Sequence, residues 1–364
     1  MDYIKNKRVL VTGCCGTVGS ELTRALLDSS VFSPKEVIGI DNNESGLFFI
    51  DQQYLNDSRA SFFLGDVRDG KMLNKMMRGV DVVFHSAALK HVVLCERSPF
   101  DAVQTNIHGV QNLIHAATEN NVEKVVFTSS DKAVNPTNVM GTSKLMGERL
   151  MTAANSCQRG DGPIFTSTRF GNVLGSSGSV VPIFHKQIAK GGPLTLTHNE
   201  MTRFVMSVEE AVRLVIDSAS YAQGGEVFVT KMPVVFIKDL AKVMIQELAP
   251  VYGFRPDEIE VIEMGSKPGE KLYEELMSHE ETRRAIELSN YFSILPAFRG
   301  IYRDIPYDYE SVESFEVKNP YVSADEEPLS LEELKGFLRR HKLLSEGSVA
   351  PKHPDERYWP GDKK

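Results

Sequence analysis

The sequence predicts an α/β fold in which a doubly wound parallel sheet is followed by a smaller C-terminal α/β domain. Short β-branched runs alternate with helical patterns along the first half of the chain, which is typical of βαβ units with right-handed crossovers. A glycine-rich turn follows the first of these runs, where such sheets place their first strand-to-helix connection. The length of 364 residues allows two closely packed domains.

Five apolar runs predict the first strands of the sheet, and helices are expected between them, including one from about Val18 and one over 99–120. The strand runs are RVLVTG, EVIGI, SFFLGD, DVVFHSA and KVVFTSS. A helix and a strand, SVEEAVRLVIDSAS and EVFVT, are expected to return to the sheet after a less regular stretch. Elsewhere the pattern predicts strands at 194–197 and 259–263 and helices at 237–249 and 330–344.

Domain boundaries follow from this pattern. We expect the first domain to span residues 1–175, with 206–231 returning to it, and the second domain to combine 176–205 with 232–345. Residues 346–364 are polar and contain proline, which predicts a loosely held tail.

Composition limits the classes of function. A net charge of −8 argues against a nucleic-acid-binding surface, which needs a basic patch. No apolar run reaches the roughly 18 residues that span a bilayer, and the chain enters a strand too early for a signal peptide. The four cysteines lack the spacing of a metal site or of a disulfide framework. We therefore expect a cytoplasmic, reduced protein without a membrane span.

Gly13, Gly16 and Gly19 form a G-x-x-G-x-x-G turn between the first strand and the first helix. Glycines there let the backbone approach a pyrophosphate, whose charge the helix N-terminus stabilises; a tight turn without a ligand is the alternative. Asp41 closes the second strand about twenty residues later, where a carboxylate binds the ribose hydroxyls of NAD and repels the 2′-phosphate of NADP. The pattern predicts a Rossmann-type NAD site, although Asp-Asn-Asn is also turn chemistry in its own right.

Other residues after the same strands are expected to bind this cofactor. Cys14 and Cys15 are interpreted as small fillers of the loop, because neither has a basic neighbour that would stabilise a thiolate. The further expected cofactor-binding residues are Thr17, Val18, Asn42, Asp66 (which would face the adenine), Val67, Ala87, Ala88 and Lys90.

The segment SSDKAVNPTNVMGTSK, residues 129–144, places an acid and an amine side by side. Asp131 and Lys132 follow an apolar strand and are preceded by Ser130, while Met140 and Lys144 lie four residues apart on the helix that follows. Pairing would lower the pKa of the aspartate and raise that of the lysine, and our hypothesis is that one proton moves between the two groups. We therefore predict the catalytic centre in this segment.

Several motifs, in order along the chain, resemble the extended short-chain dehydrogenase/reductase superfamily. They are TGCCGTVG, GDVRD, HSAALKHVVLCERSPFDAVQTNIHGVQNLI, SSDKAVNPTNVMGTSK, TRFGNVLGSSGSVVPIF, MTRFVMSVEEAV and KPGEKLYEEL. Within this superfamily, the chain is similar to nucleotide-sugar 4,6-dehydratases of bacterial polysaccharide and glycan biosynthesis, which act on UDP-N-acetylglucosamine. The likeness extends from about residue 6 to about residue 300. It implies that the smaller domain binds the nucleotide sugar.

The resemblance implies a cycle of three stages. NAD accepts a hydride from sugar carbon 4, a proton leaves carbon 5 while the carbon 6 hydroxyl departs as water, and the hydride returns to carbon 6. The cofactor is not consumed, so the net reaction is a dehydration. By the same resemblance, Lys132 removes the carbon 5 proton, Asp131 protonates the departing hydroxyl, Ser130 contacts the 4-hydroxyl and Lys144 binds the nicotinamide ribose.

Met140 stands where relatives normally have the tyrosine that deprotonates the 4-hydroxyl. A thioether cannot accept that proton, so the resemblance requires another base, either Asp131 or a water. Methionine occurs at this position in a subset of the family. Core packing is the alternative role for the side chain, and a pseudoenzyme is the alternative for the protein.

The resemblance also indicates substrate-binding residues in both domains. Arg203 in MTRF is a bidentate donor suited to pyrophosphate, with a surface ion pair as the alternative. Glu270 suits a nucleotide ribose hydroxyl, or else serves only a helix start. Asn106 is interpreted as a structural hydrogen-bonding residue. The remaining expected substrate contacts are Lys90, His91 and Asn172.

Several alternatives stay open from the sequence. Asp41 and Met140 favour family members that retain the configuration at carbon 5 over the inverting ones, which commonly use NADP. GDP-N-acetylglucosamine is an alternative substrate. An NAD-dependent sugar epimerase and a non-catalytic nucleotide-sugar sensor are alternative functions. The resemblance also implies a homo-oligomer.

Overall fold

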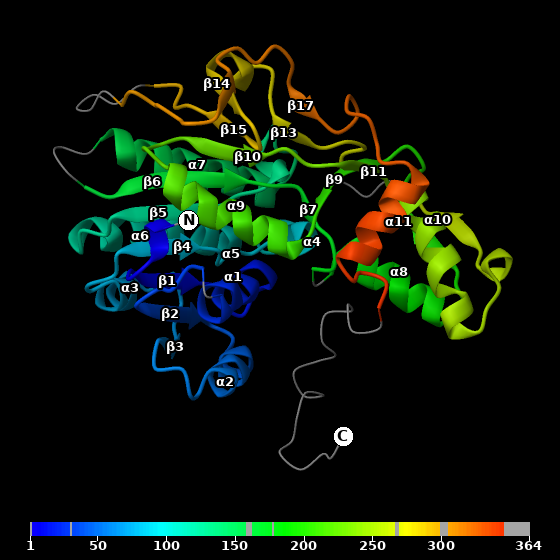
Figure 1. The fold of residues 1–364 in the computed structure, drawn as a ribbon, viewed down its shortest axis with the longest axis horizontal. Helices are drawn as coiled ribbons and strands as arrows, with labels where there is room; N and C mark the ends of the chain where they lie inside the picture. Colours follow the sequence, from blue (N-terminus) through cyan, green and yellow to red (C-terminus); the bar gives the residue numbers. More distant parts are fainter. Residues whose placement is uncertain are drawn as a thin grey trace. The chain divides into compact units, whose positions relative to one another are not determined.

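The chain divides into two compact units in a computed structural model, whose fold is drawn in Figure 1. Unit 1 comprises residues 1–170, 209–231 and 275–321, and unit 2 comprises residues 171–208, 232–274 and 322–364. The structure describes residues 2–29, 31–157, 162–176, 178–265, 269–298 and 305–345. The predicted tail, 346–364, lies outside the described residues.

Within its described residues, unit 1 is built on a ten-stranded sheet in the order β16-β14-β15-β10-β6-β5-β4-β1-β2-β3. Neighbouring strands from β10 to β3 are parallel, whereas β15, β14 and β16 extend the sheet with antiparallel pairs. The order of the first strands is that of a doubly wound sheet, so the predicted Rossmann-type fold is confirmed. The strands are β1 (Arg8–Thr12), β2 (Glu36–Asp41), β3 (Ala60–Leu64), β4 (Val82–His85), β5 (Lys124–Thr128), β6 (Ile164–Arg169), β10 (Val227–Thr230), β14 (Ala285–Leu288), β15 (Tyr291–Ile294) and β16 (Val312–Ser314).

Helices pack on both faces of this sheet. Leu10 of β1 points into a core shared with α3, α6 and α7, while Val9 and Val11 point to the opposite face, where α1 packs. The helices and helical turns are η1 (Asp2–Ile4), α1 (Thr17–Asp28), α2 (Glu44–Gln53), α3 (Gly70–Met76), α4 (Val92–Arg97), α5 (Pro99–Val103), η2 (Gln104–His108), α6 (Gly109–Glu119), η3 (Asp131–Ala133), α7 (Val139–Ser156), α9 (Val208–Tyr221) and η6 (Glu281–Arg284).

The predicted domain boundaries differ from the units mainly in one segment. The sequence placed 232–345 in the second domain, but residues 275–321 belong to unit 1. β15 pairs with β10, and β14 with β15, so this segment widens the sheet. This return to the sheet depends on pairing with β10, a strand that lies much earlier in the chain, so no local pattern indicates it.

Unit 2 contains a small sheet in the order β11-β9-β7 and a separate pair, β12-β8. Its apolar core joins α8, α10 and α11 through buried side chains such as Phe184, Leu240 and Phe337. The strands and helices expected within 194–197, 237–249, 259–263 and 330–344 are all observed. They and their neighbours are β7 (Asn172–Val173), α8 (Val180–Ala189), β8 (Leu194–Leu196), β9 (Thr202–Met206), β11 (Val234–Phe236), α10 (Ile237–Leu248), η4 (Pro250–Tyr252), η5 (Pro256–Glu258), β12 (Val261–Glu263) and α11 (Leu331–Arg340).

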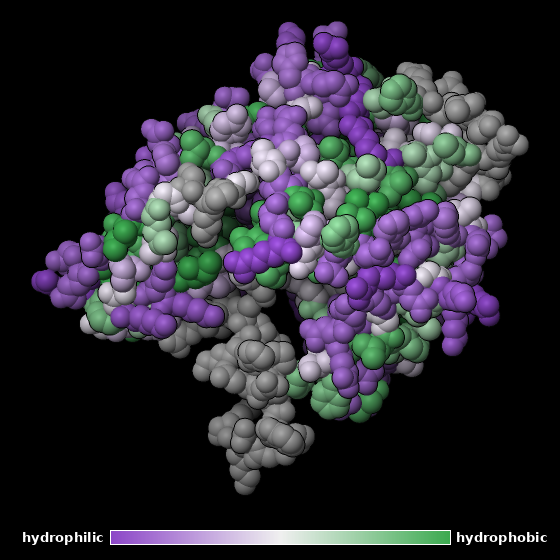
Figure 2. All heavy atoms as spheres, turned by 180° about the vertical axis from the view of Figure 1, so that it is seen from behind, coloured by the Kyte–Doolittle hydropathy of each residue, from purple (hydrophilic) through white to green (hydrophobic). Residues whose placement is uncertain are grey.

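Hydrophilic side chains dominate the face of the molecule drawn in Figure 2, with hydrophobic side chains between them. The exposed large hydrophobic residues include Phe48, Phe100 and Phe298, which lie in separate segments of the chain. None of the helices in the described ranges is both long enough and apolar enough to cross a bilayer.

Candidate functional site

A crevice of about 620 Å³ lies in unit 1 beside the carboxyl ends of β1, β2 and β4. Doubly wound sheets bind their ligands at this edge. Thr17, Val18 and Gly19 form the first turn of α1 and are not among the lining residues. The expected residues that do line it are Gly13, Gly16, Asp41, Asn42, Asp66, Val67, Ala87, Ala88, Lys90 and His91.

The connection from β1 to α1 requires glycine at positions 13 and 19. Gly13 has a φ of +73°, and a Cβ there would lie 2.6 Å from the Ala87 nitrogen. A Cβ on Gly19 would lie 2.0 Å from the Gly13 carbonyl oxygen. Both distances are far below van der Waals contact, so only glycine lets these segments approach. The same lack of side chains leaves room for a phosphate against the backbone.

Backbone N–H groups orient the Asp41 carboxylate at the end of β2. Cys15 N donates to Oδ2 and Asn43 N donates to Oδ1, each at 2.9 Å. A carboxylate oxygen accepts more than one hydrogen bond, so Asp41 can also accept from ribose hydroxyls. Nearby, hydrogen bonds from Arg68 lower the pKa of Asp66, which keeps a second carboxylate ionised at the crevice.

Ser130, Asp131 and Lys132 lie together at the carboxyl end of β5, at η3. The Ser130 hydroxyl donates to Asp131 Oδ1, and Lys132 Nζ donates to Oδ1 and Oδ2 of Asp131 at 3.1 and 2.9 Å. The Asp131 side chain is 2% exposed, whereas that of Lys132 is 33% exposed. The structure thus brings the three predicted catalytic groups into one hydrogen-bonded set, with a buried carboxylate and a partly exposed amine.

Backbone packing holds this set in place. Asp131 N donates to Phe170 O at 3.1 Å, which ties η3 to the end of β6. The start of α7 comes so close that a Cβ on Gly141 would lie 2.2 Å from Lys132 O. Asn138 caps α7, because its Oδ1 accepts a hydrogen bond from Gly141 N at 2.8 Å.

Lys144 of α7 is buried at the end of β5. Its Nζ donates to Thr128 O at 2.9 Å and lies 4.8 Å from the centre of the Phe127 ring. Burial lowers the pKa of Lys144 to about 8, although the charge of Glu148 opposes this shift. Lys144 therefore titrates within reach of physiological pH.

Met140 and Asn106 have packing and structural contacts. Met140 is 3% exposed and packs in a small apolar cluster with Cys95 and Ala102, which supports the packing role.

Asn106 lies in the π-helical turn η2, which interrupts the helix expected over 99–120. Its side chain bonds Leu89 N and O at 2.9 and 3.0 Å and Ser143 Oγ at 2.9 Å. The interpretation of Asn106 as a structural residue is confirmed.

Two expected substrate contacts of unit 2, Arg203 and Asn172, both bond Glu274, which the sequence did not indicate. Arg203 Nε lies 3.1 Å from Glu274 Oε1, and Asn172 Nδ2 donates to both Glu274 oxygens at 3.0 Å. Glu270 lies 3.7 Å from Arg203 Nη2. Arg203 therefore forms the ion pair that was its alternative role, but it is only 9% exposed, so this pair is not on the surface. Nothing in EEL distinguishes Glu274 from its neighbour Glu275.

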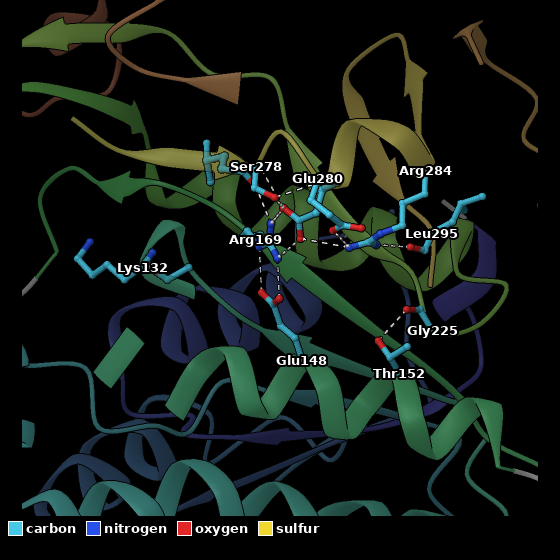
Figure 3. Close-up of polar contacts among 12 residues, drawn as sticks. Lys132, Glu148, Thr152, Arg169, Gly225, Ser278, Glu280, Arg284 and Leu295 are labelled. Carbon is cyan, nitrogen blue, oxygen red and sulfur yellow. Dashed lines mark hydrogen bonds and ion pairs between the residues drawn. The ribbon is translucent and has the colours of Figure 1, made fainter. Parts of the chain in front are cut away.

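The sequence also did not indicate a buried ion cluster around Arg169, which is drawn in Figure 3. Arg169 donates to Glu148 at 3.0 and 2.7 Å, to Glu281 at 3.1 and 3.0 Å, and to Leu276 O at 2.8 Å. Burial alone would lower the pKa of Arg169, but the two carboxylates raise it. Burial alone would raise the pKa of Glu281, but the charge of Arg169 lowers it to about 2. In Figure 3 none of the dashed lines from Arg169 reaches Lys132.

Sequence similarity to known proteins extends across both units of this chain. Residues 9–296 match the family described as polysaccharide biosynthesis protein. An uncharacterised membrane protein of Methanocaldococcus jannaschii is 50% identical over 295 residues, which cover 81% of this chain and 87% of the relative. A UDP-N-acetylglucosamine 4,6-dehydratase (inverting) of Campylobacter jejuni is 36% identical over 327 residues, covering 89% and 94%. A UDP-glucose 4-epimerase of Rickettsia bellii is 37% identical over 333 residues, covering 92% and 95%.

A solved structure shares the fold over nearly the whole chain. Pen from Bacillus thuringiensis is 39% identical and has a TM-score of 0.86, over 94% of this chain and 100% of that one. The span matched by the family includes the glycine turn, the 129–144 segment and the Glu274 cluster.

Proposed function

The chain belongs to the polysaccharide biosynthesis protein family, and we propose that it is an NAD-dependent nucleotide-sugar 4,6-dehydratase, a hydro-lyase. The Ser130–Asp131–Lys132 set carries this proposal, because it joins a hydroxyl, a carboxyl and an amine at the carboxyl end of β5. A 4,6-dehydration moves protons at three places on the sugar: the 4-hydroxyl, carbon 5 and the 6-hydroxyl. These three groups supply a donor or an acceptor for each of them.

The residues of the crevice fit NAD. The glycine turn has no Cβ where a pyrophosphate must approach, and the oriented carboxylate of Asp41 suits an unphosphorylated adenosine ribose. When bound, NAD accepts the hydride from carbon 4 and returns it to carbon 6. We assign Lys144 to the nicotinamide ribose, where its ammonium adds a buried positive charge.

We assign the 4-hydroxyl proton to Ser130 and Asp131, in place of a tyrosine. Ser130 Oγ takes the proton while passing its own to Asp131, to which it is hydrogen-bonded. Asp131 later gives that proton to the departing 6-hydroxyl, which leaves as water. Asp131 therefore ends the cycle as the carboxylate it was at the start, and Met140 needs no part in proton transfer.

Lys132 is the proposed base at carbon 5. The negative charge of ionised Asp131 favours the ammonium form of Lys132. When the 4-hydroxyl proton reaches Asp131, it neutralises the carboxylate, and the ammonium is no longer stabilised by it. The amine, which is 33% exposed, then releases a proton to solvent and accepts the one from carbon 5. The ammonium, whose protons exchange with solvent, then gives a proton to carbon 5 as the hydride reaches carbon 6, and solvent restores the ammonium. One water is lost in total, and no proton is left over.

We propose UDP-N-acetylglucosamine as the substrate, supported by the motif resemblance and by the name of the Campylobacter relative. Arg203 and Asn172 are proposed to bind its pyrophosphate and Glu270 its nucleotide ribose. Lys90 and His91, at the crevice, are proposed to contact the sugar. GDP-N-acetylglucosamine offers the same sugar and pyrophosphate, so it belongs in the same assay.

Retention of configuration at carbon 5 is the proposed outcome, from Asp41 and Met140. The name of the Campylobacter relative supports inversion instead. Proton NMR of the product formed from UDP-N-acetylglucosamine in ordinary water separates the two, because the carbon 5 proton is kept there and the couplings of the ring protons differ between the epimers.

An epimerase is a second candidate, because the Rickettsia relative carries that name. Purified protein is incubated with UDP-N-acetylglucosamine, GDP-N-acetylglucosamine and UDP-glucose, and the products are followed by mass spectrometry and chromatography. Loss of water from the first substrate supports the dehydratase, while a changed sugar of unchanged mass supports the epimerase. Binding without conversion would contradict both and favour a nucleotide-sugar sensor.

A further inference from the structure

Two adjacent cysteines, which the proposed reaction does not use, form a cluster with Asp41. The Sγ atoms of Cys14 and Cys15 and a carboxylate oxygen of Asp41 lie within 4.8 Å of one another. Among the histidine, cysteine, aspartate and glutamate side chains of the described residues, these three form the group whose possible ligand atoms all lie within that distance. The sequence interpretation of the cysteines as loop fillers does not account for the carboxylate beside them.

The donor set is that of a thiophilic cation. Cysteine sulfur and carboxylate oxygen both bind Zn²⁺, and sulfur ligands select it over hard cations such as Mg²⁺. Three protein ligands leave a fourth position of a tetrahedral site for water. We propose that Cys14, Cys15 and Asp41 bind a thiophilic divalent cation, Zn²⁺ or Cd²⁺, and that the bound cation excludes the dinucleotide.

The surrounding backbone holds these ligands in place. Cys15 N donates to Asp41 Oδ2 at 2.9 Å, which fixes the carboxylate next to the thiols. Gly39 and Gly46 make room for the sulfur atoms. A Cβ on Gly39 would lie 2.9 Å from Cys14 Sγ, and a Cβ on Gly46 would lie 3.0 Å from Cys15 Sγ. Cys14 is fully buried and Cys15 is half-buried, so a cation would enter from the Cys15 side.

Cysteine binds a cation as the thiolate, so binding displaces the thiol proton. Zn²⁺ and Cd²⁺ bind thiolate more strongly than Mg²⁺ does, which again favours them at this site.

Exclusion follows from the position of the ligands. Cys15 and Asp41 line the crevice together with Gly13 and Gly16, and Asp41 is the residue assigned to the adenosine ribose. A cation on the Asp41 carboxylate occupies the acceptor that the ribose hydroxyls need. Each ligand must then weaken the other by the same factor. This second half of the inference rests on the proposed NAD site, whereas the cation site itself does not.

Cadmium titration of the full-length, dinucleotide-free protein tests the site, because cadmium–thiolate bonds absorb in the ultraviolet. The wild type should show this absorption and bind Cd²⁺ about tenfold or more tightly than Cys14→Ser or Cys15→Ser. Cys157→Ser is the matched control, since Cys157 is an exposed cysteine at the end of α7, and it should match the wild type. Saturating NAD should weaken Cd²⁺ binding roughly tenfold or more, and Zn²⁺ should weaken NAD binding.

Equal Cd²⁺ binding by the wild type and the Cys15→Ser variant would overturn the site, and this pair decides even if Cys14→Ser does not fold. Cd²⁺ and NAD that bind the wild type independently would overturn the exclusion. Failure of NAD to bind the cation-free protein, with cadmium–thiolate absorption intact, would instead overturn the proposed cofactor while supporting the cation site.

Discussion

Two groups of charged residues in unit 1 differ in how they are buried. Arg169 is fully buried, and its partners Glu148 and Glu281 are buried with it. The Asp131–Lys132 pair has its carboxylate inside and its amine 33% exposed. A charge enclosed by fixed opposite charges keeps one protonation state, whereas one that reaches water can exchange protons. Burial thus separates a structural cluster from a group able to do acid–base chemistry.

Removing Lys132 should have the largest effect on activity. Lys132→Ala removes the proposed base, so kcat should fall by about 10²–10⁴-fold, and solvent deuterium should no longer enter carbon 5 at the normal rate. Both are measured with UDP-N-acetylglucosamine in heavy water. Lys5→Ala, at an exposed lysine, is the control and should behave as the wild type. Normal deuterium entry in Lys132→Ala would show that another group is the base.

Removing Arg169 should have the largest effect on stability. Arg169→Met leaves two buried carboxylates without their cation, which should lower the free energy of unfolding by about 3–5 kcal/mol in urea titrations. Arg169→Lys keeps the charge but loses the planar fork, so its loss should be smaller. The kcat of the folded fraction should stay closer to wild type than that of Lys132→Ala. A stable Arg169→Met variant with a catalytic defect as large as that of Lys132→Ala would reverse the two assignments.

The sequence indicated the Asp131–Lys132 pair but not the Arg169 cluster. The difference lies in how far apart the partners are along the chain. Asp131 and Lys132 are neighbours, and the glycine turn is local, so their chemistry can be predicted before the fold is known. The partners of Arg169 are 21 and 112 residues away, and Glu274 is 102 residues from Asn172. Only the folded chain brings such residues together. Residues 275–321 were assigned to the wrong domain for a related reason, because β15 returns to the sheet by pairing with β10, which lies much earlier in the chain.

Lys144 lies between these extremes, because it is buried yet titrates near neutral pH. Its pKa of about 8 means that the ammonium is lost as pH rises above that value. If the ammonium binds the nicotinamide ribose, kcat/KM should fall about tenfold per pH unit above pH 8. Lys144→Arg keeps its charge in this range, so its remaining activity should lack this alkaline limb. An unchanged limb in Lys144→Arg would assign the titration to another group.

Met140 should show the smallest effect, because it contributes only packing. Met140→Leu conserves volume and should cost less than about 1.5 kcal/mol of stability, with kcat unchanged. Met140→Tyr introduces the tyrosine that the family resemblance implies at this position, but it enlarges a side chain enclosed by Cys95 and Ala102, which should cost about 1–3 kcal/mol. With Ser130 and Asp131 already receiving the 4-hydroxyl proton, the added phenol should not raise kcat, and Ser130→Ala should lower it in both backgrounds. A Met140→Tyr variant that is faster than wild type and indifferent to Ser130→Ala would show that proton removal from the 4-hydroxyl limits this enzyme and that Ser130 is not its route.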